Sequence, residues 1–462
     1  MISTDTNHRP DQTPEAVTPQ GKGVAWRVFT SVLVTISLAA CGGGSSQEEI
    51  SQFTTSAQAA VIADEPQAAL VGRDILAQGG NPVDAAVAMA LTLSVTLPSR
   101  IGLLGGGSCL VHDPSTGDDD GNDSQVTSID FRPLPVPRAD GSRSEYGSPG
   151  MLRGLFAMHA RFGNLRFEQL IIPAERLARF DGQISRSLAN DLEAFSDRLD
   201  STLHPVWSGV SSDLPVGSAI PWDVTAGALA LLRQDGIGVF YSGRAGREVA
   251  SELGLDAEAW ASTTPQILEI DGQGDLAVLN GTDRLYLPPG IAESDVVAAL
   301  ANIGRNQPVP AVDGDAPPAT SLVVKGSGDF VVACGLTQGM AFGIGEPTGA
   351  FALWPARAVA MDLPLSDGFI GPVLIANENV GELRLAGVVS GSDDVPTPML
   401  TGAQQLFEGQ AVAAGDARRI IAQPAGGGVR RSLVSCGRAN DDGDRRCSAA
   451  IDPQVRGLAI TP

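Results

Sequence analysis

Few side chains in this sequence can act as bases or metal ligands, and this limits the chemistry that the protein can perform. Apart from His8, the only histidines are His112, His159 and His204. None of them is spaced with a second histidine or a cysteine as metal ligands usually are, so we expect no zinc site. None lies near a nucleophile motif, which disfavours a Ser-His-Asp triad. We expect no metal and no cofactor.

The first cysteine, Cys41, follows an apolar run at 28–40 that is itself preceded by Lys22 and Arg27. This run is too short to cross a bilayer, and the small residues before Cys41 suit a signal peptidase. The pattern resembles a lipoprotein signal peptide; an uncut membrane anchor is the alternative. The resemblance implies that Cys41 is lipidated and that the protein is exported, tethered to the cell envelope and facing the periplasm.

The N-terminal region accordingly divides into three predicted segments. They are 1–23, a disordered stretch or an extension ahead of the true start; 24–40, the signal peptide; and 41–57, a flexible tether rich in Gly and Ser near its start.

The other four cysteines enter an oxidising compartment if the chain is exported, and they can then pair. Cys436 and Cys447 bracket a polar loop at 437–446. A disulfide that closes so short a loop would contribute about 2–3 kcal/mol, and we predict this pair. Cys109 and Cys334 each stand among apolar residues in strand-like segments, so we predict that they are buried and pack as small hydrophobic side chains.

The elements that would position these residues change in character along the chain. Apolar spacing, caps and Gly or Pro punctuation predict helices at 65–78, 82–93, 149–163, 166–179, 185–199, 222–232 and 399–414. Alternating and β-branched runs predict strands at 108–112, 126–131, 321–324, 330–334, 372–376 and 383–390. A Pro-, Gly- and Asp-rich linker at 307–317 separates a mainly helical region, 58–306, from a strand-rich region, 318–462.

Length and charge exclude several classes of protein. The chain has 462 residues, 43% of them hydrophobic, which is enough to bury a large core. Its 53 acidic and 31 basic residues give a formal net charge of -22. Because this charge repels phosphate backbones, nucleic acid is not an expected partner.

Several motifs occur in the same order as in the gamma-glutamyltransferase family. Residues 79–88 read Gly-Gly-Asn-Pro-Val-Asp-Ala-Ala-Val-Ala and resemble that family's G-G-N-A-V-D-A-A-V-A. Further similar segments follow at 102–108, 130–132, 147–155, 167–177 and 238–243. The chain is therefore similar to this family over about residues 59–254.

The resemblance implies an α+β fold of the N-terminal-nucleophile hydrolase type, an αββα sandwich with two sheets between helical layers. It also implies a precursor that cuts itself, after which a new N-terminal threonine attacks γ-glutamyl amides such as glutathione while its own amine accepts the proton. A γ-glutamyl small molecule is the implied ligand. Arg132 matches the family arginine that holds the ligand's α-carboxylate, for which a planar guanidinium is suited; a salt bridge within the fold is the alternative.

The nucleophile position departs from the family pattern. The family's T-T-H-x-S-V-V-D corresponds to residues 318–325, which places Pro318 at the nucleophile. Proline has no hydroxyl, so it can neither cut the chain nor attack an amide. Thr320 is the candidate replacement, but a shift of two residues along a strand displaces a side chain by about 6.6 Å. A displacement of about 1 Å can already cost about a hundredfold in rate.

Other family positions have changed as well. Leu336 and Gln338 stand where the family has a threonine and an asparagine, and Ser366 and Asp367 are what remains of its P-L-S-S-M. We take Gln338, Ser366 and Asp367 as candidate substrate-binding residues. The family's paired glycines, which supply oxyanion-hole amides, fall near 392–394, where carboxylates would repel an oxyanion.

Three hypotheses follow for the function. The first is a degenerate family member, with lost or reduced transfer and hydrolysis of γ-glutamyl amides. The second is an active hydrolase of such amides that uses Thr320, or Ser321, after self-cleavage. The third is a non-enzymatic binding or structural protein of the cell envelope.

Overall fold

The computed structural model of the protein describes residues 59–115, 126–196, 214–219, 222–270, 282–289, 318–359, 371–377, 379–391, 416–422, 429–437 and 445–461. Several predicted features lie outside these residues: segments 1–23, 24–40 and 41–57 with Cys41, the linker 307–317, Ser366, Asp367, positions 392–394 and the helix at 399–414.

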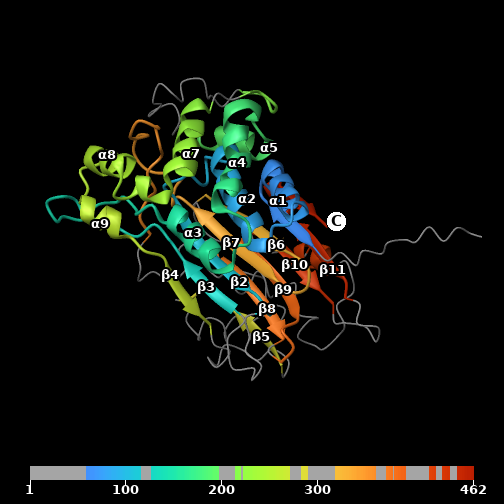
Figure 1. The fold of residues 1–462 in the computed structure, drawn as a ribbon. Coiled ribbons are helices and arrows are strands. Elements are labelled where there is room, and N and C mark those ends of the chain that lie inside the picture. Colours follow the sequence, from blue (N-terminus) through green and yellow to red (C-terminus); the bar gives the residue numbers. More distant parts are fainter. Residues whose placement is uncertain are drawn as a thin grey trace, which may run out of the picture. The chain divides into compact units, whose positions relative to one another are not determined.

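Two antiparallel sheets stack face to face (Figure 1). The seven-stranded sheet has the order β12 (Leu458–Ile460), β1 (Ala60–Ala63), β6 (Ala319–Lys325), β7 (Val331–Thr337), β2 (Gly106–His112), β3 (Val126–Asp130) and β4 (Gln266–Glu269). The five-stranded sheet has the order β11 (Cys447–Ile451), β10 (Arg430–Cys436), β9 (Leu383–Ser390), β8 (Gly371–Asn377) and β5 (Asp283–Tyr286).

The seven-stranded sheet combines strands from both halves of the chain. The predicted strands at 108–112 and 126–131 form a hairpin, since β2 pairs with β3, and those at 321–324 and 330–334 form another, since β6 pairs with β7. The strand β2 also pairs with β7, so the helical region and the strand-rich region share one continuous hydrogen-bond ladder. Regions 58–306 and 318–462 are therefore joined through the centre of the sheet, not only through the chain between them.

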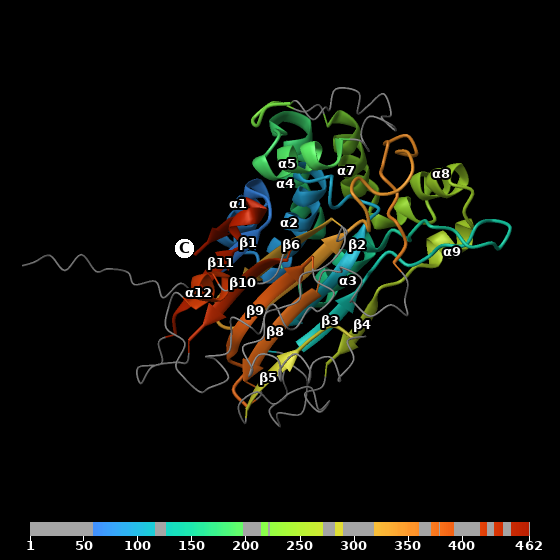
Figure 2. The same ribbon diagram turned by 180° about the vertical axis from the view of Figure 1, so that it is seen from behind.

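Helices cover the outer faces of this stack (Figures 1 and 2). On the seven-stranded sheet, α1 contacts β1, α2 contacts β6 and β7, and α3 contacts β2. On the five-stranded sheet, α12 packs against β10 and β11. The described helices are α1 (Pro66–Ala77), α2 (Pro82–Thr96), α3 (Gly150–Phe162), α4 (Phe167–Arg176), α5 (Arg186–Ala194), α7 (Asp223–Asp235), α8 (Arg244–Glu252), α9 (Ala257–Ser262) and α12 (Asp416–Ala422). The αββα layering expected from the family resemblance is confirmed.

The central helix, α2, shows how the sequence directs this packing. The Asn81 side chain accepts hydrogen bonds from the amides of Val83 and Asp84, and the Asp84 carboxylate accepts one from the Asn81 amide. This capping box fixes the start of the helix, with Pro82 at its first position. Every residue of α2 is buried, because its small and aliphatic side chains fit between the sheet and the helices α1 and α4.

Alternation along β6 separates two hydrophobic cores. Leu322 and Val324 belong to the core between the sheet and the helices. Ala319 and Val323 belong to the core between the two sheets. Because successive side chains of a strand point to opposite faces, Thr320 lies on the helix side and Ser321 on the side of the second sheet.

Two disulfides cross neighbouring strands. Cys436 and Cys447, the pair favoured by the sequence, join β10 to β11. Cys109 and Cys334 are buried as predicted, but they do not pack as separate small side chains, since they form a second disulfide between β2 and β7. They are 225 residues apart in sequence and become partners only because the two strands pair in this register.

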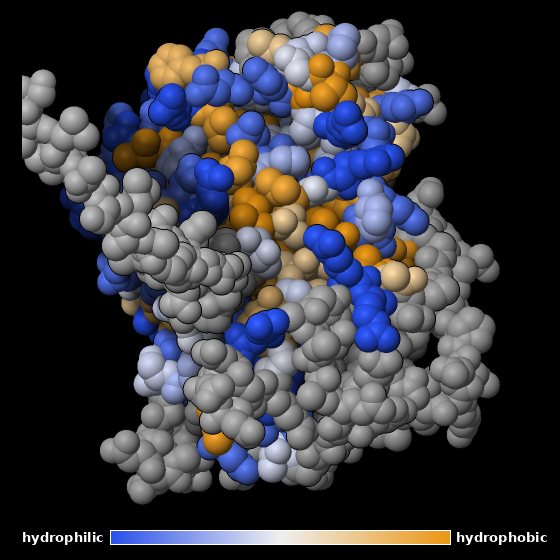
Figure 3. All heavy atoms as spheres, turned by 90° about the vertical axis from the view of Figure 1, so that its right-hand side faces the viewer, coloured by the Kyte–Doolittle hydropathy of each residue, from blue (hydrophilic) through white to orange (hydrophobic). Residues whose placement is uncertain are grey.

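Apolar side chains also reach the surface. On the face shown in Figure 3, hydrophobic residues gather in a band that is bordered by hydrophilic ones. A groove of about 600 Å³ lies between α1 and α4, with Leu70, Ile75 and Ile172 among its lining residues. Within the described ranges, no helix combines the length and the apolar composition that a bilayer crossing requires.

Candidate active site

The strand β6 begins beside Pro318, the residue that the family resemblance predicts at the nucleophile position. Pro318 directly precedes Ala319, the first residue of β6. The Thr337 hydroxyl, at the end of β7, donates a hydrogen bond of 2.9 Å to the Pro318 carbonyl oxygen. Leu336, which stands where the family has a threonine, packs into the core between the sheet and the helices.

Thr320, the candidate replacement nucleophile, is buried within the sheet. Its exposed fraction is 0%. Its hydroxyl oxygen has no hydrogen-bond partner among the described residues. A nucleophilic hydroxyl needs a base within hydrogen-bond reach and a path for the substrate. In this conformation of the chain, Thr320 has neither.

Ser321, the next hydroxyl along β6, is held by a buried carboxylate. Its Oγ donates to Asp64 Oδ1 at 2.6 Å, and its amide donates to Asp64 Oδ2 at 3.0 Å. Its Oγ also lies 2.8 Å from the Ser432 hydroxyl of β10. Burial raises the pKa of Asp64, and Arg100 and Ser321 oppose this effect. The arrangement ties β6 to β1 and β10 inside the core.

Arg100 is a site residue that the sequence analysis did not single out. Its Nε and Nη2 bind both oxygens of Asp191 at 2.8 and 2.9 Å, and its Nη1 lies 3.7 Å from Asp64. The same Nη1 donates a 3.4 Å hydrogen bond to the carbonyl of Ala319. Arg100 therefore holds the first residue of β6 through a buried ionic network. Its position just before the glycine-rich turn at 102–107 was the only signal in the sequence.

Gln338 lies directly after β7 and is fully buried. Its side-chain amide donates to the Pro98 carbonyl at 2.7 Å, and its main-chain amide donates to the Arg100 carbonyl at 3.1 Å. These bonds hold the turn that carries Arg100. Gln338 thus takes part in positioning Arg100, and it does not line the pocket described next.

Arg132 follows β3 and lines a pocket of about 200 Å³, which we call the inner pocket. Its Nε and Nη2 bind the two oxygens of Asp130 at 2.7 to 3.0 Å. Both side chains are largely buried, with exposed fractions of 11% and 15%. The pocket also contains Arg153 and the first residue of α3, Gly150.

Arg132 and Pro318 lie at the same end of the strands in the seven-stranded sheet. Strand β3 pairs with β2, β2 with β7, and β7 with β6, and the ends of all four strands meet near Gly106 and Thr337. Three strand spacings separate the two residues, a distance of about 14 Å between their backbones. The sheet therefore places the predicted carboxylate-binding residue and the predicted nucleophile position at the same end of its strands.

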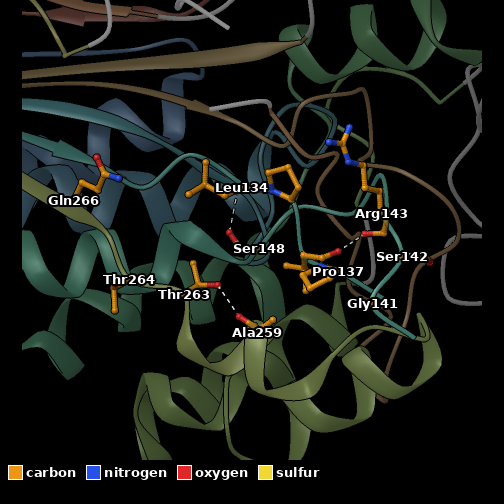
Figure 4. A pocket seen from close by; sticks show the side chains of 13 residues that line it. Leu134, Pro137, Gly141, Ser142, Arg143, Ser148, Ala259, Thr263, Thr264 and Gln266 are labelled. Carbon is orange, nitrogen blue, oxygen red and sulfur yellow. Dashed lines mark hydrogen bonds between the residues drawn. The ribbon is translucent and has the colours of Figure 1, made fainter. Parts of the chain in front are cut away.

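A larger cavity of about 780 Å³, the outer cavity, adjoins the inner pocket. The two share Leu134, Thr263, Thr264 and Gln266 as lining residues. Figure 4 shows Gln266 and Thr264 at one end of the outer cavity and Gly141, Ser142 and Arg143 at the other. Together the inner pocket and the outer cavity can hold a small ligand with one end beside Arg132 and Arg153.

Among the described residues, no cluster of His, Cys, Asp or Glu side chains could hold a metal ion.

Comparisons with known proteins agree with this architecture. The gamma-glutamyltranspeptidase family model matches residues 68–256. The chain is 29% identical to glutathione hydrolase 5 proenzyme of Homo sapiens over 266 residues, which cover 54% of this chain and 44% of that protein. It is 29% identical to glutathione hydrolase proenzyme of Bacillus subtilis over 211 residues, which cover 43% and 36%. The match thus spans less than half the length of these relatives.

A solved structure extends the likeness over more of the chain. Cephalosporin acylase from Bacillus halodurans superimposes with a TM-score of 0.61 at 16% identity and covers 87% of this chain and 95% of that one. At this identity the likeness concerns the fold. The chain therefore has an N-terminal-nucleophile hydrolase fold, and its residues 68–256 are similar to the gamma-glutamyltranspeptidase family.

Proposed function

We propose that this protein is a degenerate gamma-glutamyltransferase of the cell envelope, which no longer cuts itself and no longer transfers or hydrolyses γ-glutamyl groups. The observation that carries the proposal is Pro318 at the head of β6. Self-cleavage needs a hydroxyl oxygen there, which attacks the preceding carbonyl carbon as the C–N bond breaks. Proline offers no such oxygen, and the free primary amine that would serve as the base is never made.

The contacts around Pro318 support an intact chain. Thr337 holds the Pro318 carbonyl, Arg100 holds the Ala319 carbonyl, and Asp64 holds the amide and hydroxyl of Ser321. These bonds restrain Pro318, Ala319 and Ser321, three of the four residues at 318–321. The segment is thus stabilised as the start of a continuous strand.

The second candidate function is a hydrolase that uses Thr320. The observation in its favour is the Thr320 hydroxyl itself, which lacks a partner among the described residues and is free to react if the strand shifts. Against it stand the complete burial of Thr320 and the distance of about 6.6 Å along the strand from position 318. We favour the degenerate protein, whose retained role is to bind a small γ-glutamyl-like molecule in the inner pocket and outer cavity.

The location at the envelope rests on the signal-like segment that ends at Cys41. A lipid chain on Cys41, with the Gly- and Ser-rich stretch after it, would hold the folded part near a membrane surface. Mass spectrometry of protein purified from membranes would detect the lipid on Cys41. Protein recovered only in the soluble fraction, with an unmodified Cys41, would contradict this part of the proposal.

Turnover of a chromogenic γ-glutamyl anilide tests the proposed loss of activity. We expect no release of the aniline above the level of the Thr320→Ala variant. Release by the natural protein that disappears in Thr320→Ala would establish the hydrolase instead. Ser321→Ala, which leaves Thr320 in place, distinguishes the two adjacent hydroxyls.

A further inference from the structure

The inner pocket contains three charged side chains, Asp130, Arg132 and Arg153. Two of them neutralise each other, because the Arg132 guanidinium binds both oxygens of the Asp130 carboxylate. An anion that approached Arg132 would have to compete with this carboxylate, which is already bound. The net positive charge of the pocket therefore comes from Arg153.

Arg153 is held in place while most of its hydrogen-bonding capacity stays unused. Its Nη1 donates to the Thr263 carbonyl, and its guanidinium lies over the Tyr241 ring, 3.9 Å from the ring centroid. Among the described residues, no carboxylate lies within ion-pair distance of Arg153, and its remaining guanidinium N–H groups have no acceptor. A guanidinium has five donors in a fixed plane, so these groups are available to a ligand.

Tyr241 supplies the rigid surface under Arg153. It is 1% exposed, and its hydroxyl donates to the Pro149 carbonyl at 2.5 Å while accepting from the Arg153 amide at 3.0 Å. A fixed aromatic ring restricts the guanidinium to one plane, which lowers the entropy lost when an anion binds. The geometry is thus prepared before any ligand arrives.

The start of α3 adds to the positive potential of the same pocket. Gly150, the first residue of α3, lines the pocket, and the first turn of this 13-residue helix contains no acidic residue. The amides of Gly150, Met151 and Arg153 already donate to Ser148, Gly105 and Tyr241, so the helix start contributes its dipole and not free N–H groups. A side chain at this position is excluded, because a Cβ on Gly150 would lie 1.9 Å from the Phe131 carbonyl oxygen.

We propose that Arg153 binds the carboxylate of a small amino-acid or peptide ligand in the inner pocket, and that the rest of this ligand extends into the outer cavity. In this arrangement Arg132 stabilises the pocket wall through Asp130 and does not hold the anion directly. The inference rests on the proposed binding role and is independent of the loss of the nucleophile. It goes beyond the family resemblance, which points to Arg132.

Calorimetric titration of the full chain with glutathione, L-glutamate and inorganic phosphate tests the assignment. Arg153→Met keeps the apolar stem and removes the charge; we expect it to weaken glutathione and glutamate binding by about ten- to a hundredfold, since a bond to a charged group is worth about 1.5–3 kcal/mol. Arg153→Lys should restore part of the affinity. The matched control is Arg161→Met on the same helix, whose partner is Glu269 and which lies outside the pocket.

The double variant Asp130→Asn with Arg132→Met separates the two arginines. Because the charges of Asp130 and Arg132 cancel, the double variant should weaken ligand binding far less than Arg153→Met does. The single variant Arg132→Met is less informative, because it leaves the Asp130 carboxylate to repel the ligand. Thermal melting of each variant confirms that it is folded.

The inference is overturned if folded Arg153→Met binds glutathione and glutamate like the natural protein, if phosphate binds more tightly than either, or if none of the probes binds. The last result would leave the loss of the nucleophile untouched, because that is tested by the integrity of the chain.

Discussion

The hydroxyl of Thr337 donates a 2.9 Å hydrogen bond to the carbonyl oxygen of Pro318. This bond closes the end of the β6–β7 pair at the residue that the family resemblance predicts for the nucleophile position. A residue that must become a free and reactive N-terminus would gain little from such a restraint. Under the proposed function this position stabilises the sheet instead.

The Thr320 hydroxyl, which has no partner among the described residues, should cost stability. Thr320→Val replaces the buried hydroxyl with a methyl group of similar size, so we expect the free energy of unfolding to rise by about 1 kcal/mol. Ser321→Ala is the matched comparison, since it removes the partner of the buried Asp64 carboxylate and should lower stability by about 2 kcal/mol. Urea unfolding of both variants measures the difference. A Thr320→Val variant less stable than the natural protein would mean that the hydroxyl has a partner essential to the fold.

The ionic network at Arg100 should be essential for folding. Arg100→Met would leave Asp64 and Asp191 buried without their cation, and breaking a buried pair in this way costs about 3–5 kcal/mol. Adding Asp191→Asn should recover part of the loss, because one uncompensated charge is removed. Arg73→Met is the control, since its pair with Asp74 is exposed and is worth at most about 1 kcal/mol. Equal stability of the Arg100→Met and Arg73→Met variants would contradict the role given to Arg100.

The contact between His159 and Asp84 should make stability depend on pH. The hydrogen bond to Asp84 raises the pKa of His159 above its ordinary value of 6.5. Because the folded state favours the protonated ring, this contribution to stability is fully present below pH 6.5 and is lost as the pH rises through the raised pKa. Urea unfolding at a series of pH values should show this loss, and His159→Gln should remove it. An unchanged pH profile in His159→Gln would assign the dependence to other groups.

The two disulfides should differ in their effect on stability. Cys109 and Cys334 are 225 residues apart, whereas Cys436 and Cys447 are 11 apart. In the chain-entropy model, a longer closed loop restricts the unfolded state more. We expect the Cys109→Ala, Cys334→Ala variant to lose about 5 kcal/mol and the Cys436→Ala, Cys447→Ala variant about 2–3 kcal/mol. A larger loss for the second pair would show that local effects on the β10–β11 hairpin outweigh loop entropy.

Local patterns in the sequence predicted much of the secondary structure. Asn81, Pro82 and Asp84 marked the start of α2, and the β-branched run at 321–324 marked β6, because caps and alternation act between near neighbours. The glycine- and proline-delimited helices before residue 233 were likewise visible. The layered fold came from the family resemblance.

Contacts between distant residues were not visible in the sequence. Asp64 and Ser321 are separated by 257 positions, and Cys109 meets Cys334 only because β2 pairs with β7. The ion pair of Arg132 with Asp130 and the stacking of Arg153 on Tyr241 are visible only in the folded pocket. Side-chain chemistry could thus be listed from the sequence, while its electrostatic surroundings could not.

Intact-mass measurement and N-terminal sequencing of the purified protein test the central claim most directly. The account predicts a single chain that continues unbroken through Pro318, Ala319 and Thr320. Two chains, with a new N-terminus at Thr320 or at any position from 318 to 321, would contradict it.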